Sequence, residues 1–199
     1  KQGEGGSNMT NLITKLRSHF PNLMIHVLNG SDDADISTEI YDLGFIGTTK
    51  PPEDSIATLL TNIDMCIYGT KDYFDKNKTR NDFEWVAYKR NDKFDTDYII
   101  KSFFQNPNII ISSNSYQDAH SLVASGNGVT FLTDLDGESD ERLICFNRDD
   151  YSFRIGFYLV QHELSRSNPI VAAVKKVILE NTKDAIQDTS FVSLNSKDK

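Results

Sequence analysis

The sequence predicts an α/β protein in which short strands and amphipathic helices alternate. Apolar runs of strand length recur along the chain, and stretches with helical periodicity lie between them. A polar, charged segment at residues 70–82 separates a first set of elements, which ends near Tyr68, from a second set. Parallel neighbours need a crossover connection, usually a helix, so the repeated strand–helix–strand order favours mostly parallel sheets in two successive units.

The first set opens with a helix predicted over residues 9–20. Its apolar side chains recur at helical spacing, at Met9, Leu12, Ile13, Leu16 and Phe20. Pro21 closes this run, and Ser7 or Asn8 would cap the helix. The alternating run at residues 23–28 predicts a strand. The turn residues after it include Ser31 and precede a short helix.

Three more segments complete the first set and begin the second. LGFIG at residues 43–47 predicts a strand buried on both faces, KPPE at 50–53 a loop, and IDMCIYG at 63–69 another strand. Further strands are predicted at residues 83–88, 108–112, 129–132, 143–147 and 153–161, and helices at 98–104, 116–125 and 168–181. In the last helix Asn168 is the cap and Pro169 the first helical residue.

Composition restricts the function. The 199 residues include 21 Lys and Arg against 29 Asp and Glu, and the net charge of −8 argues against a broad phosphate-binding surface. No apolar run approaches the ~18 residues that span a bilayer, so we expect no membrane segment and a cytoplasmic location. A leader removed before Lys1 stays open as an alternative. Cys66 and Cys145 are expected to be buried thiols, with a redox pair as the alternative.

Several motifs, in a consistent order, resemble the effector-binding domain of LysR-type transcriptional regulators. They are LITKLRSHFPNLMIHVLNGS, DLGFIGT, IDMCIYG, NSYQDAHSLVASGNGVTFL and FRIGFYLVQHELSRSNPIVAAVKKVILEN, and they span about residues 9–181. The sequence departs from the family in three places. The strand that would precede GEGGSN is cut or missing, the stretch from Gly30 to Asp42 is short, and Thr133 stands where proline is common.

The resemblance implies a type 2 periplasmic-binding-protein-like fold, with two Rossmann-like lobes of mixed, mostly parallel sheets joined by two crossing strands. Residues 1–68 and 151–182 would form lobe I, residues 69–150 lobe II, and residues 183–199 a polar, mobile tail. It also implies a small-molecule effector between the lobes and a homodimer within a larger tetramer. DNA would be bound only through a winged helix-turn-helix domain that this chain does not contain.

Two loops could hold such an effector, because helix starts offer unpaired N–H groups and the positive end of the helix dipole. These loops are residues 5–8 and residues 113–115, each ahead of a predicted helix. Serine and asparagine there are also ordinary helix caps. The resemblance places effector contacts in these loops and at two further turns, and the expected ligand-binding residues are Gly6, Ser7, Asn8, Ser31, Thr48, Thr49, Ser113, Asn114 and Ser115. A small anion or carboxylate suits such groups.

No pattern of a catalytic, metal or cofactor site is present. The four histidines are scattered, and the spacing of Asp32, Asp33 and Asp35 does not complete an EF-hand. We therefore expect an effector-binding regulatory domain that is not an enzyme. Two alternatives stay open: a solute-binding protein of a transporter with the same fold, and an enzyme on an unrelated α/β fold that uses His120 or Asp118.

Overall fold

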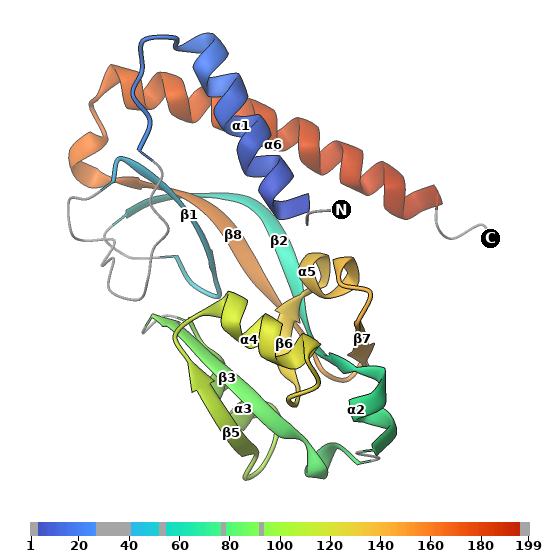
Figure 1. Ribbon diagram of the computed structural model, residues 1–199. Coiled ribbons are helices and arrows are strands. Elements are labelled where there is room, and N and C mark those ends of the chain that lie inside the picture. Colours follow the sequence, from blue (N-terminus) through green and yellow to red (C-terminus); the bar gives the residue numbers. More distant parts are fainter. Residues whose placement is uncertain (1–3, 27–40, 52–54, 77–78, 92–93, 196–199) are drawn as a thin grey trace.

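A computed structural model describes residues 4–26, 41–51, 55–76, 79–91 and 94–195 of the protein, with backbone alone for 4–9, 80, 90, 91, 94 and 183–195 (Figure 1). Two long strands, β2 (Ser55–Thr70) and β8 (Ser152–His162), run through the middle of the molecule. They pair antiparallel from Ser55 opposite His162 to Cys66 opposite Ser152, with a register shift between Leu59 and Thr61. The prediction of two crossing strands is therefore confirmed.

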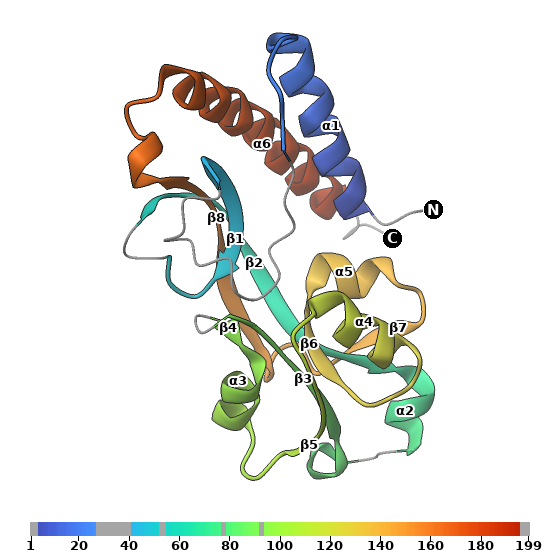
Figure 2. The same ribbon diagram turned by 60° about the vertical axis from the view of Figure 1, so that its left-hand side comes forward.

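One end of these strands carries a helical layer. β1 (Leu43–Thr48) pairs antiparallel with β8, and α1 (Glu4–His19) lies with α6 (Pro169–Asn195) over this end of the sheet (Figures 1 and 2). A small core forms between the helices and the sheet from Leu12, Leu16, Leu159 and Ile178. The helical spacing of leucines that predicted the first helix thus serves to bury one face of α1.

The other end of the crossing strands is built around β3 (Glu84–Asn91). β5 (Asn108–Ser113) pairs parallel with β3, and the short β4 (Phe94–Asp95) pairs antiparallel with it. A parallel bridge between Trp85 and Val129 links β3 to β6 (Thr130–Thr133). β6 and β7 (Leu143–Phe146) both pair antiparallel with β2.

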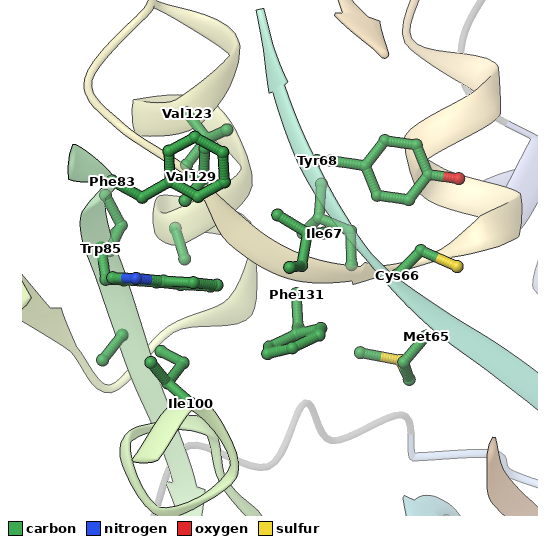
Figure 3. Packing of buried hydrophobic residues seen from close by; sticks show 14 of the residues in the cluster. Met65, Cys66, Ile67, Tyr68, Phe83, Trp85, Ile100, Val123, Val129 and Phe131 are labelled. Carbon is green, nitrogen blue, oxygen red and sulfur yellow. The ribbon is translucent and has the colours of Figure 1, made fainter. Parts of the chain in front are cut away.

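Helices cover this second sheet region and enclose the larger core. They are α2 (Lys71–Lys76), α3 (Thr96–Phe103), α4 (Tyr116–Ala124) and α5 (Asp134–Ser139), with a 3-10 turn at Arg80–Asp82. A second 3-10 turn, Glu163–Ser165, lies at the opposite end of the molecule, between β8 and α6. In Figure 3, Trp85 lies between Val123 of α4 and Ile100 of α3, all three of them buried. The ring of Trp85 stacks on Phe131 with centroids 5.6 Å apart. Such large aromatic side chains contribute much of a core's buried apolar area.

Several predictions need correction. α1 begins at Glu4, so Gly6, Ser7 and Asn8 lie within its backbone and not in a loop ahead of it. Residues 23–26 do not form a strand, while Ser31 and the short helix expected near it lie outside the described residues. The polar tail expected from residue 183 has helical backbone as far as Asn195.

The sheets are mixed, as predicted, but among the described residues antiparallel ladders predominate. The β3–β5 ladder and the Trp85–Val129 bridge are parallel, whereas the ladders of β1, β8, β2, β6 and β7 are antiparallel. Much of this pairing belongs to the crossing strands themselves, because β8 runs antiparallel to β2 over almost its whole length.

Candidate functional site

The start of α4 follows directly on the end of β5. Ser115 is the N-cap with extended backbone (φ −121°, ψ 123°), and its Oγ accepts the amide of Asp118 at 3.2 Å. The Ser113 Oγ accepts the amide of Ser115 at 3.0 Å, and Asn114 is exposed. The capping interpretation of this stretch is therefore confirmed. Two hydroxyls fix the turn from strand to helix and leave the asparagine facing solvent.

The turn after β1 holds Thr48 and Thr49. Thr48 is 1% exposed; its Oγ1 donates to the Lys50 carbonyl at 2.8 Å and accepts the Lys50 amide at 3.3 Å. Thr49 is exposed. The hydroxyl of Thr48 is therefore engaged within the turn, and Thr49 is the residue of the two that a ligand can reach.

The structure brings three of the four predicted regions toward the middle of the molecule. The end of β1 and the start of α4 lie between the α1–α6 layer and the sheet of β3 and β5 (Figures 1 and 2). The start of α1, with Gly6, Ser7 and Asn8 in its backbone, lies near α5 in both views. The fourth region, around Ser31, lies outside the described residues.

The starts of α4 and α5 are tied together by a network that the sequence did not reveal. The Tyr116 hydroxyl donates to Asp136 Oδ2 at 2.6 Å and accepts the Thr133 amide at 3.2 Å. Thr133 is the N-cap of α5; its Oγ1 accepts the Asp136 amide at 3.1 Å and donates to Asp136 Oδ2 at 2.8 Å. Burial and the nearby carboxylate of Asp136 raise the pKa of Tyr116, so this phenol stays protonated and donates.

A second network anchors α5 to the crossing strand β2. Arg148 forms ion pairs with Asp134 and, at 2.6 Å, with Glu138, both on α5. Tyr68 of β2 donates to Asp134 Oδ1 at 3.2 Å. The sequence signal for these contacts was weak, because the carboxylates of DLDGES are typical of a loop as much as of a helix.

The two thiols lie next to this second network. Cys66 is fully buried and Cys145 half-buried, and both are free. The β2–β7 register puts Cys145 opposite Tyr68, so Cys66, two residues earlier on β2, shares its face of the sheet. Burial raises the pKa of both thiols, so little thiolate forms at neutral pH. The expectation of a buried thiol is confirmed for Cys66, whereas Cys145 is only half-buried.

A third group of charged residues lies near the loop that follows α5. His120 Nε2 lies 3.1 Å from Asp140 Oδ2, without the alignment of a hydrogen bond, and Arg142 Nη2 lies 2.6 Å from the same oxygen. Lys89 is exposed. Over the residues that the structure describes, no three His, Cys, Asp or Glu side chains gather as metal ligands would. None of the described helices is long and apolar enough to cross a membrane.

Two hollows on the described surface lie away from the predicted residues. One, of about 370 Å³, lies beside α6. The other, of about 640 Å³, lies at the end of α3, next to Phe104 and Pro107. Neither contains a residue from the turn after β1 or from the start of α4.

Comparisons with known proteins agree with this architecture. A family model described as the LysR substrate binding domain matches residues 5–183. No curated protein matches the chain. Among solved structures, the Synechocystis PCC6803 CcmR regulatory domain in complex with 2-PG has a TM-score of 0.72 at 12% identity, with 88% of this chain and 91% of that chain covered.

Two further regulators have similar structures. The regulatory domain of AphB from Vibrio vulnificus has a TM-score of 0.63 at 12% identity, covering 89% of this chain and 94% of that one. CrgA from Neisseria meningitidis, a LysR-type transcriptional regulator, has a TM-score of 0.65 at 13% identity and covers 88% of this chain. The match spans 63% of the CrgA chain. At these identities the similarity establishes the fold.

Proposed function

Because the chain belongs to the LysR substrate binding domain family, we propose that its effector is a small anion that binds between the two cores, at the start of α4. The protein is an effector-binding regulatory domain of a LysR-type regulator, a class that senses ligands and does not catalyse reactions. The family match favours this function over a transporter's solute-binding protein of the same fold.

The main support is the pair of amides at the start of α4. The amide of Asp118 donates to Ser115 Oγ, and the amide of Ala119 donates to the Ser115 carbonyl at 3.1 Å. Among the described residues, the amides of Tyr116 and Gln117 have no hydrogen-bond acceptor. Two unpaired donors at the positive end of a helix dipole suit a carboxylate or phosphate group.

Other predicted residues would complete the site around these amides. Thr49 and Asn114 are exposed and would donate or accept hydrogen bonds to the rest of the effector. The backbone at Gly6, Ser7 and Asn8, at the start of α1, would contribute further contacts. Ser113 and Ser115 would position the amides by holding the turn. The contacts proposed for Ser31 and for the hydroxyl of Thr48 are secondary, because Ser31 is not described and Thr48 is engaged with Lys50.

Regulation requires more than binding. The effector must have different affinities for two arrangements of the cores or subunits, because a ligand that binds both equally shifts nothing. LysR-type regulators act as oligomers on DNA. We propose a homodimer, side by side and antiparallel, within a tetramer that works in the cytoplasm. DNA binding would belong to an attached winged helix-turn-helix domain, since this chain has a net charge of −8.

The proposal is tested by screening small carboxylates and phosphate esters, 2-PG among them, for a rise in the melting temperature of the chain. Ser115→Asp keeps an oxygen that can cap α4 but puts a negative charge at the anion site. We expect this variant to fold and to lose the temperature rise that a hit gives. Ser121→Ala, on the exposed side of the same helix, is the control and should respond like the unmodified chain. An equal rise with Ser115→Asp would reject the start of α4 as the site.

A further inference from the structure

The hollow of about 370 Å³ beside α6 has the features of a second ligand site. It is lined by Gln161, Arg166, Ala172, Lys175, Lys176, Leu179 and Glu180. Five of these residues come from α6, spaced so that they share one side of the helix. Gln161 comes from the end of β8, and Arg166 from the turn between β8 and α6. The hollow therefore shares no residue with the site at the start of α4.

The charge of this hollow is opposite to that of the chain. Three cations line it against one carboxylate, although the protein as a whole carries −8. Arg166 pairs with Glu163 at 3.1 Å, and Lys176 lies 4.0 Å from Glu180. Among the described residues, Lys175 pairs with no carboxylate; its Nζ donates to Gln161 Oε1 at 3.2 Å. Lys175 is thus a half-buried ammonium whose charge its described partner does not neutralise.

Gln161 fixes this ammonium in place. Its side chain belongs to a residue that is only 5% exposed, and its Nε2 donates to the Ser165 carbonyl at 3.1 Å. Both ends of the amide are therefore used, and the oxygen that faces Lys175 cannot rotate away without losing the Ser165 bond. An ammonium held at the wall of a hollow is ready to bind an anion, because little side-chain freedom remains to be lost.

We propose that this hollow binds a small aliphatic carboxylate, for which succinate is the probe. One carboxylate lies on Lys175, between Arg166 and Lys176, and the methylene groups pack on Leu179 and Ala172. The site is separate from the effector site, and neither depends on the other.

The test is a titration of the ¹⁵N-labelled chain with succinate, followed by amide chemical shifts. We expect saturable shifts at Gln161 and along the Ala172–Leu179 side of α6. Lys175→Gln removes the charge and should weaken binding about tenfold or more, as expected for the loss of a charge-assisted hydrogen bond. Lys101→Gln, on α3 and paired with Asp97 at 2.7 Å, is the matched control and should leave the affinity unchanged.

A second variant and two control ligands distinguish specific binding from a loss of folding and from non-specific attraction of anions. Ala172→Leu fills the hollow without touching the Lys175–Gln161 bond, so it should abolish the shifts while the melting temperature stays the same. Succinamide, which is uncharged, should not bind, and inorganic phosphate should bind more weakly than succinate. The proposal is overturned if succinate shifts only the start of α4, if Lys175→Gln binds equally well, or if succinamide binds like succinate.

Discussion

At the scale of single residues, Asp140 has a carboxyl group whose pKa is clearly lowered, and the cause is the neighbouring Arg142. Arg142 donates to it from Nε at 2.8 Å and from Nη2 at 2.6 Å, and the Arg142 amide adds a third bond at 3.1 Å. These bonds lower the pKa of Asp140 to about 2, although partial burial acts in the opposite direction. The carboxylate holds the loop between α5 and β7, where it also lies against His120 of α4.

We therefore expect Asp140→Asn to lower the free energy of unfolding in a pH-dependent way. The folded pKa lies below the unfolded value near 3.8, so the contribution of Asp140 is fully present above that pH and is lost as the pH falls toward 2. Because Arg142 is mostly exposed, solvent screening limits the effect to about 1 kcal/mol at pH 7. Urea unfolding at pH 7, 4 and 2 measures it, with exposed Asp149→Asn as the control. A difference that stays constant with pH would contradict this account.

The candidate site could be predicted where a residue acts on its own neighbours. Ser115 was identified as a cap because capping needs only the residue and the helix after it. The contact of Tyr116 with Asp136 joins positions that are far apart in sequence, so no local pattern revealed it. Thr133 was noticed as a departure from the family, and its role as the cap of α5 became clear only from the structure.

At the scale of elements, the return from α4 to β6 depends on two glycines with different surroundings. Gly126 (φ +86°) and Gly128 (φ +97°) both have backbone conformations that disfavour other residues. A Cβ at Gly126 would meet only Thr70 Oγ1, at 3.9 Å, whereas a Cβ at Gly128 would lie 2.3 Å from the Glu84 carbonyl oxygen. That oxygen accepts the amide of Val129 at 2.9 Å, a bond that joins β6 to β3.

These surroundings predict unequal effects of the same substitution. Gly126→Ala should cost about 1–2 kcal/mol, because only the backbone conformation is strained. Gly128→Ala should cost about 3 kcal/mol or more, because the backbone of β3 must also move. Chemical unfolding of the two variants measures the difference, and each variant is the other's control. Equal losses would mean that the close approach of Gly128 to β3 contributes nothing.

Periodicity predicted whether most elements are helices or strands, but it did not predict the full length of β2 or the existence of α5. The strands at β1, β3, β5, β6, β7 and β8 were predicted because each is a short apolar run between turn residues. The length of β2 was missed, since polar residues such as Thr61 and Asn62 interrupt its apolar pattern. They are tolerated in the strand because β8 supplies backbone partners for most of its length. α5 was missed because its glycine and carboxylates favour a loop.

At the scale of the whole molecule, β2 and β8 are the link between two cores. Leu12, Leu16, Leu159 and Ile178 form the smaller core at one end, and the aromatic core around Trp85 lies at the other. The register shift between Leu59 and Thr61 interrupts the β2–β8 ladder between these cores. Leu60, at this shift, packs against the smaller core, and a bulge bends and twists its strand locally.

The proposed homodimer gives a prediction at the same scale. Among the described strands β5 pairs only with β3, so one of its backbone edges has no strand partner. Ile110 on this edge is 44% exposed, and Tyr98 on the adjacent α3 is 76% exposed. An uncovered edge with exposed apolar side chains is what a second subunit would cover.

We expect sedimentation of the chain to show a dimer that Ile110→Asp weakens at least about tenfold, since a charge would be buried at the contact. Leu164→Asp, at a 70% exposed position before α6, is the control and should remain dimeric. A chain that stays monomeric at high concentration, or a dimer that Ile110→Asp leaves intact, would rule out this edge as the contact between subunits.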